Sequence, residues 1–152
     1  MTKAKHSILV LCTGNSARSQ MAEYLLRKYG GERFQVYSAG TEPKGVNPLT
    51  VRVMNEIGID MTEARSKNLN EYLGKLPVHI LIVVCHDADQ KCPAIWPGVL
   101  ERLFWPFEDP AAATGSEEVR VESFRRVRDV IDAKVQEWVE NLPANYTPGF
   151  RR

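Results

Sequence analysis

The sequence predicts an α/β fold, with one domain built on a four-stranded parallel sheet flanked by helices. Short apolar runs alternate with longer segments in which apolar residues recur at helical spacing. The two strongest runs, ILVL at residues 8–11 and HILIVV at 79–84, are largely apolar, which is typical of parallel strands buried on both faces. A chain of 152 residues suffices for one domain with a proper core.

The expected elements follow from apolar periodicity and from residues that begin or end helices. Gly30-Gly31 should end the first helix, and Asn47-Pro48 should begin the second with a cap and a proline at the first helical position. We assign residues 1–142 to the domain and 143–152 to a loose tail, because the tail contains two prolines and a glycine. The expected strands are residues 7–11, 34–39, 79–84 and 103–107, and the expected helices are residues 18–29, 48–58 and 117–141, with a short helix at 69–73.

Composition excludes several classes of protein. The net charge of +1 gives no reason to expect nucleic acid or an anionic membrane surface as a partner. No apolar run approaches the roughly 20 residues that a membrane helix needs, and the apolar start is better explained as the first strand than as a signal peptide. Three cysteines are too few, and odd in number, for a disulfide framework. We therefore expect a cytoplasmic protein, plausibly a monomer, whose thiols are kept for chemistry.

One segment, CTGNSARS at residues 12–19, carries the candidate chemistry. It lies between an apolar strand and a helix, so backbone N–H groups can surround a tetrahedral oxyanion and should lower the pKa of Cys12. The Arg18 guanidinium can bind two anion oxygens, Gly14 should take a positive φ, and both serine hydroxyls should donate to the sulfur or the anion. A buried cysteine beside a surface arginine is the simpler alternative, which the clustered small polar residues disfavour. The expected oxyanion-binding residues are Thr13, Gly14, Asn15, Ser16, Ala17, Arg18 and Ser19.

This segment resembles the active-site loop that low-molecular-weight protein tyrosine phosphatases share with the arsenate reductases of the same fold. The resemblance covers nearly the whole chain, from about residue 7 to residue 138. It implies that fold, with an oxyanion such as arsenate or phosphate as the ligand. Since these two anions are alike in shape and charge, the loop alone does not separate a reductase from a phosphatase.

Two further cysteines bear on that choice. Cys85 directly follows a strand, so a parallel sheet would place it at the same rim as Cys12, while Cys92 follows on a polar, acidic segment. The residues alone allow two unrelated cysteines, or a relay in which Cys85 attacks Cys12 and Cys92 closes on Cys85. A zinc site with His79 and His86 is disfavoured, because His79 begins the strand that Cys85 ends, about 20 Å away.

The spacing of Cys85 and Cys92 resembles that of the thioredoxin-linked arsenate reductases. By that resemblance, Cys12 attacks arsenic, Cys85 attacks Cys12 and releases arsenite, and Cys92 attacks Cys85 to leave a disulfide for a thioredoxin-type reductant. Several relatives carry another cysteine just before the loop arginine, where this chain has Ala17, but the relay does not require it. Reduction of arsenate takes two electrons, which one disulfide formed from two thiols supplies.

Asp109 is the candidate general acid. It precedes Pro110 in a loop after the fourth expected strand, and the related enzymes use the same Asp-Pro to protonate the leaving oxygen. Asp-Pro also begins many ordinary turns, and the neighbouring Glu108 is the fallback candidate.

The resemblance also raises the question of a monovalent cation. In some related reductases, counterparts of Asn15, Glu23 and Ser38 help to hold potassium, with other ligands from the segment that matches residues 65–67 here. This chain has Arg65 and Lys67 there, so we expect either a cation site or the Lys67 ammonium in its place, or simply a solvated lysine. No other cofactor or metal is expected.

The sequence thus predicts an arsenate reductase that uses Cys12, Arg18, Cys85, Cys92 and Asp109. A phosphatase acting on phosphotyrosine or aryl phosphates is the nearer alternative, although Trp105 is not convincingly placed to form the aromatic wall that such an enzyme tends to need. A non-catalytic oxyanion-binding protein is the farther one, and it would gain nothing from a reactive thiolate.

Overall fold

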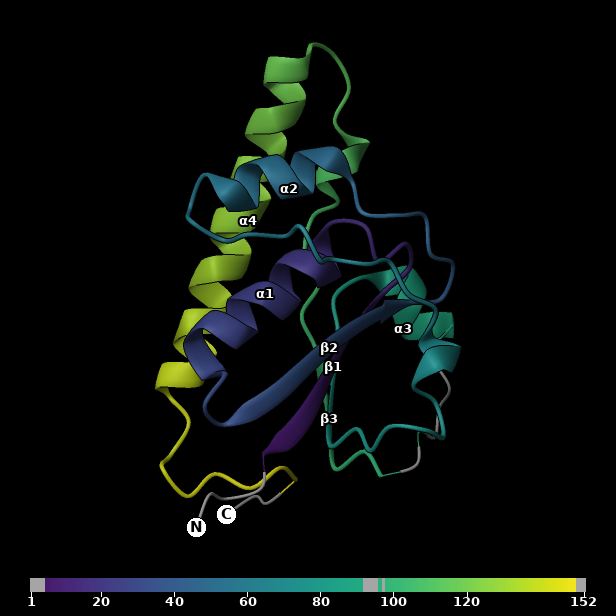
Figure 1. Cartoon of the computed structure of the whole chain (residues 1–152), viewed down its shortest axis with the longest axis vertical. Coiled ribbons are helices and arrows are strands. Elements are labelled where there is room, and N and C mark those ends of the chain that lie inside the picture. The colour runs from purple at the N-terminus through teal and green to yellow at the C-terminus, as the bar shows by residue number, and fades with distance from the viewer. Residues whose placement is uncertain (1–4, 92–95, 97, 150–152) are drawn as a thin grey trace.

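The computed structural model describes residues 5–91, 96 and 98–149, and it confirms the predicted four-stranded parallel sheet. The strands lie in the order β2-β1-β3-β4, with every neighbouring pair parallel. Helices fill the connections between them (Figure 1). The strands are β1 (His6–Cys12), β2 (Phe34–Gly40), β3 (Ile80–Val83) and β4 (Glu101–Phe104), and the helices are α1 (Arg18–Gly30), α2 (Pro48–Asn55), α3 (His86–Lys91) and α4 (Glu117–Glu140), with 3-10 turns η1 (Leu69–Glu71) and η2 (Pro110–Ala112).

The central strands account for the apolar runs. Every residue of β3, and every residue of β1 after His6, is buried, because helices and loops cover both faces of the sheet. The prediction for the last strand was wrong in position: β4 spans residues 101–104 rather than 103–107. As an edge strand it alternates half-buried and exposed residues, so it carries no continuous apolar run, and Pro106 has no amide hydrogen with which to extend it.

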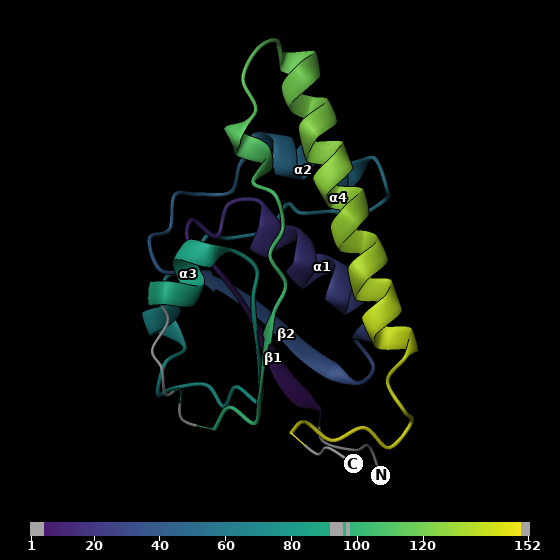
Figure 2. The ribbon, with the colours of Figure 1, turned by 180° about the vertical axis from the view of Figure 1, so that it is seen from behind.

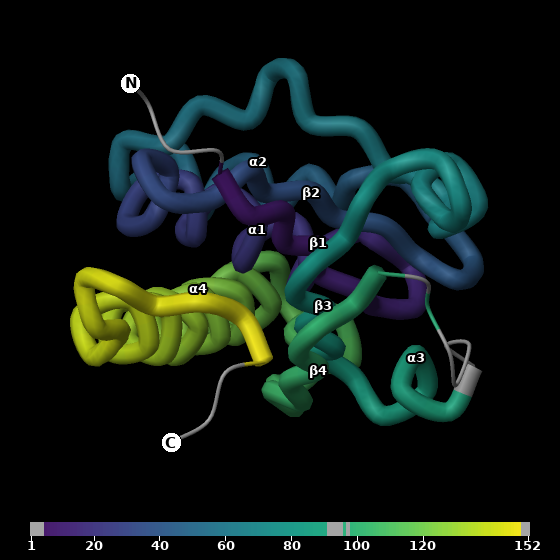
Figure 3. The backbone as a smooth tube through the Cα atoms, turned by 90° about the horizontal axis from the view of Figure 1, so that it is seen from below, coloured from purple at the N-terminus to yellow at the C-terminus, as the bar shows by residue number. Residues whose placement is uncertain are grey.

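Two long helices form one layer against the sheet. The predicted apolar stripe of α4 is buried at Phe124, Val127, Ile131 and Val135, and α4 packs along α1. Seen from below, α4 and α3 lie on either side of β3 (Figure 3), and the view from behind also shows these two helices on opposite sides of the molecule (Figure 2). The helix α3 lies beside the arrowhead end of β2, so it stands at the carboxyl rim of the sheet.

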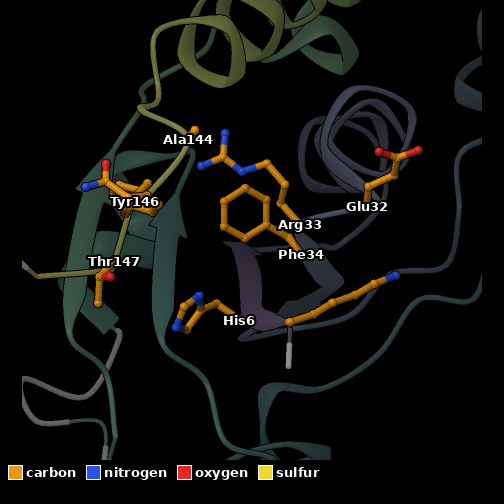
Figure 4. Close-up of a pocket in the computed structure, with 9 residues that line it drawn as sticks. His6, Glu32, Arg33, Phe34, Ala144, Tyr146 and Thr147 are labelled. Atoms are coloured by element: carbon orange, nitrogen blue, oxygen red, sulfur yellow. The ribbon is translucent and has the colours of Figure 1, made fainter. Parts of the chain in front are cut away.

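The segment after α4 is packed rather than loose as far as Gly149. The Tyr146 hydroxyl and the Gly149 amide both donate to Glu101 at the start of β4, at 3.0 and 3.1 Å. Arg33 donates to the Pro143 carbonyl at 2.6 Å. Figure 4 shows Arg33 and Tyr146 around Phe34, where they line a pocket of about 290 Å³ at the amino end of β1, the opposite end from Cys12.

Among the described residues, no helix combines the length and apolarity that crossing a bilayer requires.

Candidate active site

The carboxyl rim of the sheet carries the expected site. Cys12 is the last residue of β1 and pairs in register with Gly40 at the end of β2, while Cys85 lies two residues beyond the end of β3. A pocket of about 340 Å³ opens above Cys12. Its lining combines the loop, the arginine and the candidate acid: Cys12, Thr13, Gly14, Asn15, Ser16, Ala17, Arg18, Lys44, Asp87, Asp109 and Ala111.

The loop between β1 and α1 is held by its carbonyl groups. Five successive carbonyls, from Cys12 to Ser16, accept hydrogen bonds from groups outside the loop. A peptide N–H points away from the preceding carbonyl because the unit is planar and trans. The amides of residues 13–17 are therefore directed to the other side of the loop, toward the pocket. The donors to the carbonyls are the amides of Thr41, Glu42, Lys44 and Asn47 and the side chains of Gln20, Thr50 and Ser66.

The start of α1 completes this anion-binding arrangement. Its N-cap is Ala17, which offers no side-chain acceptor, whereas the α4 N-cap Ser116 accepts from Val119. An anion at the α1 terminus can take the role that a capping oxygen plays elsewhere. The Arg18 guanidinium is held at the rim by a 3.1 Å hydrogen bond from Nη1 to the Phe107 carbonyl.

Asn15, rather than Gly14, takes the unusual backbone conformation. Its φ is +47°, while Gly14 is not among the described residues with positive φ, so that expectation was wrong. The αL region is tolerated by asparagine, and the buried Asn15 side chain secures it. Its Oδ1 accepts from the Lys67 amide at 2.9 Å, and its Nδ2 donates to Ser19 and Ser38 at 2.8 and 2.9 Å.

Several bracing residues were not expected. Gly40 lies so close to the loop that an added Cβ would stand 3.0 Å from the Asn15 nitrogen and closer still to the Thr13 oxygen. Gln20 donates to both oxygens of Asn15. Ser19 was expected to face the anion, but it is fully buried beside Asn15 and does not line the pocket. The SAG sequence before Thr41 was the signal that could have identified Gly40 as a site of close backbone approach.

The residues at the possible cation position do not fit a bound potassium ion. The Lys67 side chain is buried, with only 8% of the residue exposed, and its Nζ donates to the Arg65 carbonyl and lies 3.7 Å from Glu23 Oε1. Ser38 turns its hydroxyl hydrogen toward Glu23, while Asn15 presents its NH₂ group to Ser38. An ammonium group and donor hydrogens therefore occupy the place where a cation needs oxygen ligands.

The two described thiols form a hydrogen-bonded pair. Both Cys12 and Cys85 are buried, and neither forms a disulfide. The Cys12 thiol donates to Cys85, which together with burial raises the pKa of Cys12, although Arg18 opposes this shift. The hydrogen bond from Cys12, with one from the Ala88 amide at 3.4 Å, lowers the pKa of Cys85. The prediction that the loop lowers the pKa of Cys12 was therefore wrong for the ligand-free protein, and the two coupled thiols titrate as a pair.

Asp109 faces the pocket and Glu108 does not. Asp109 Oδ2 lies 3.9 Å from Arg18 Nη2, and its Oδ1 accepts from the Ala111 amide, which fixes the carboxyl at the start of η2. Glu108 instead pairs with Arg126 at 3.1 Å. Of the remaining candidates, Cys92 lies outside the described residues. Within the described residues, no group of three or more His, Cys, Asp and Glu side chains could hold a metal ion.

Comparisons with known proteins agree with this geometry. A family model described as low molecular weight phosphotyrosine protein phosphatase matches residues 7–147. The chain is 45% identical over 136 residues to an arsenate reductase of Halalkalibacterium halodurans, covering 90% of this chain and 96% of that protein. A solved arsenate reductase in an oxidized state superposes with a TM-score of 0.74 at 26% identity, covering 88% of this chain and 96% of the other. A thioredoxin-dependent arsenate reductase of Corynebacterium glutamicum has a TM-score of 0.70 at 23% identity, covering 92% of this chain and 63% of that one.

Proposed function

Since the chain belongs to the low molecular weight phosphotyrosine protein phosphatase family and, within it, groups with the arsenate reductases, we propose that it reduces arsenate to arsenite by a relay of three cysteines. The contact between Cys12 and Cys85 is the observation that carries the proposal. A phosphatase needs one nucleophilic sulfur, whereas a reductase needs a second thiol within reach of the first.

In the first step, Cys12 attacks arsenate bound by the loop amides and Arg18. The Cys12 proton moves to Cys85 along their hydrogen bond, so a thiolate forms at Cys12 as the anion arrives. One arsenic–oxygen bond breaks, and Asp109 donates a proton so that the oxygen leaves as water. Its 3.9 Å approach to Arg18 supports this role, because the acid stands beside the group that holds the anion. The product is an arsenic(V) adduct on Cys12.

In the second step, Cys85 loses its proton and attacks the Cys12 sulfur. A sulfur–sulfur bond forms, the sulfur–arsenic bond breaks, and its electron pair reduces arsenic(V) to arsenic(III), which leaves as arsenite. Cys92 then attacks Cys85 and releases Cys12, and a protein dithiol reduces the Cys85–Cys92 disulfide. The spacing of these cysteines, and the thioredoxin-dependent structural relative, support thioredoxin as that dithiol.

We further propose that Lys67 replaces the monovalent cation of some related reductases. Its ammonium is buried beside Glu23, which accepts from Ser38, and Ser38 in turn accepts from the loop residue Asn15. The Lys67 ammonium is a cation that belongs to the chain, so in this position it stabilises the loop without any ion from solution. The enzyme should therefore work equally well in potassium and sodium salts.

The phosphatase alternative finds little support in the pocket. Of the pocket-lining residues that the structure describes, none is aromatic. Trp105, the candidate for an aromatic wall, is buried and packs edge-to-face on Trp138 with ring centroids 5.6 Å apart. A phosphotyrosine ring would thus find no aromatic wall among these residues.

The test is a count of free thiols with disulfide mapping on fully reduced protein, before and after arsenate, with phosphate as the control. We expect two thiols to disappear with arsenate only, and a peptide that links Cys85 to Cys92. Unchanged thiols together with steady hydrolysis of an aryl phosphate would replace the reductase with a phosphatase. A Cys12–Cys85 linkage that persists would remove Cys92 from the relay.

A further inference from the structure

The segment between β2 and α2 runs along the loop between β1 and α1 and places a lysine beside it. Amides of this segment donate in turn to the loop carbonyls, and the Lys44 amide donates to the Gly14 carbonyl at 2.9 Å. Gly45 follows with a φ of +87°, a left-handed conformation that glycine adopts without strain. The backbone of Lys44 is therefore fixed against the loop that holds the anion.

The Lys44 side chain lies over Gly14 and lines the pocket above Cys12. A Cβ on Gly14 would stand 3.5 Å from Lys44 Cδ and 3.6 Å from its Cγ, so the lysine stem covers the face of the loop on which Gly14 lacks a side chain. Lys44 is exposed, and within the part of the chain that the structure describes no carboxylate forms an ion pair with it. Its ammonium is therefore available to a ligand in the pocket.

The other charged side chains that line this pocket leave an incoming anion short of positive charge. The cations are Arg18 and Lys44, and the carboxylates are Asp87 and Asp109. Asp109 lies 3.9 Å from the Arg18 guanidinium, and Asp87 accepts from the Thr13 hydroxyl at 2.8 Å. Without Lys44, a single guanidinium would face two carboxylates as well as the anion. Since lysine binds phosphate-like groups as a point charge, its ammonium can offset the repulsion from these carboxylates.

We propose that Lys44 is a second substrate-binding cation, whose ammonium binds an oxygen of the arsenate or phosphate ion held by the loop. The inference rests on the proposed function in one respect: the pocket takes an oxyanion of this kind. Arsenate is negatively charged both before and during attack by Cys12, so the ammonium stabilises the bound substrate and the transition state alike. Lys44 should therefore lower KM for arsenate and leave kcat nearly unchanged.

The first test measures phosphate binding to the fully reduced protein by isothermal titration calorimetry, without arsenate. Lys44→Met keeps the length and apolar character of the stem over Gly14 and removes only the charge. It should raise the dissociation constant for phosphate about tenfold at low salt, as expected for loss of one charge-assisted hydrogen bond. Lys44→Arg, which keeps the charge, should stay within about threefold of the wild type. Raising sodium chloride from about 0.02 M to about 0.5 M should reduce the effect of Lys44→Met to about threefold or less, because salt screens exposed charges.

Lys75 provides a matched control. It is an exposed lysine that does not line the pocket, so Lys75→Met removes the same charge from the protein without removing a contact to the anion. Its dissociation constant for phosphate should change by less than about twofold. Circular dichroism establishes that each variant is folded. Phosphate binding by Lys44→Met that equals that of the wild type or of Lys75→Met would overturn the proposal.

The second test measures turnover with arsenate and a protein dithiol as reductant. Lys44→Met should raise KM about tenfold and leave kcat within about twofold, which is the signature of lost uniform binding. A loss confined to kcat would overturn the proposal, because the ammonium would then act on the chemical step. A protein whose phosphate binding depends on Lys44 as expected, but which does not reduce arsenate, would refute the proposed function and support this inference.

Discussion

Gly40→Ala tests whether the loop depends on close backbone contact from β2. The added methyl would lie 3.0 Å from the Asn15 nitrogen and 3.1 Å from its Cβ, with the Thr13 carbonyl oxygen nearer still. Ordinary contacts of this kind need about 3.3 Å or more, so the loop has to move by at least a few tenths of an ångström. These neighbours are backbone and a buried side chain, which cannot swing aside.

Two consequences follow from that displacement. Overpacking of a tight contact should lower the free energy of unfolding by about 1–3 kcal/mol. Because the loop amides aim at the anion, a shift approaching 1 Å can reduce turnover by about 10²-fold. Urea denaturation measures the change in the free energy of unfolding. The rise in melting temperature on adding phosphate reports anion binding independently of any redox step, and it should be smaller in the variant if the loop amides are displaced.

Gly14→Ala is the matched control for stability. A methyl there would meet the Lys44 side chain at 3.5 and 3.6 Å and the Ser16 Cβ at 3.7 Å, all of which are ordinary van der Waals contacts. We expect its free energy of unfolding to change by less than about 0.5 kcal/mol. If Gly40→Ala unfolds like the wild type and keeps its full stabilisation by phosphate, the inferred contact between β2 and the loop is wrong.

Three further predictions concern single side chains. Asp109→Asn should lower kcat/KM for arsenate by about 10²–10⁴-fold, because an amide cannot protonate the leaving oxygen, while Glu108→Gln should change it by less than about twofold; equal losses would remove Asp109 from the acid role. Lys67→Met should lower the free energy of unfolding by about 1–3 kcal/mol, since the buried Glu23 carboxylate loses one cationic partner and keeps Arg27 at 2.7 Å, and potassium-specific activation of the wild type, absent with sodium, would refute the built-in cation. Two arginines of α4 hold the pKa of Glu56 at about 2, below its ordinary value of 4.5, so its ion pairs should stabilise the fold fully above pH 4.5 and lose that contribution as the pH falls toward 2. The stability difference from Glu56→Gln should narrow over this range, and a difference that stays constant between neutral pH and pH 3 would contradict the pairing.

The fold was largely predictable because its signals are local. The runs that form β1 and β3 are apolar since both faces are covered, and Asn47 caps α2 as expected, with its side chain accepting from the Leu49 amide. The edge strand β4 was placed wrongly because half of its residues face solvent and its pairing depends on β3, a distant segment. Edge strands therefore lack the continuous apolar run by which central strands are recognised in a sequence.

The part of the site that lies in one segment of the sequence could be predicted, whereas the contacts between segments far apart in the sequence could not. The loop from Cys12 to Arg18 lies in one segment, so its chemistry can be inferred from the sequence alone. The link from Thr13 to Asp87 joins residues 74 positions apart, and that from Asn15 to Lys67 joins residues 52 positions apart. Such contacts arise from the strand order, which brings separate segments to one rim.

The anchored carbonyls of the loop have a consequence for how the enzyme tells its substrate from its main competitor. Because the loop between β1 and α1 has its shape before any anion binds, it cannot distinguish arsenate from phosphate by closing around one of them. The two ions differ little in size and charge. Both should enter and leave the pocket with similar ease. The enzyme then discriminates between arsenate and phosphate by bond strength, because an oxygen on arsenic is exchanged for sulfur far more readily than one on phosphorus. We therefore expect phosphate to occupy the pocket and slow arsenate reduction without being consumed, so that the rate depends on the ratio of the two anions.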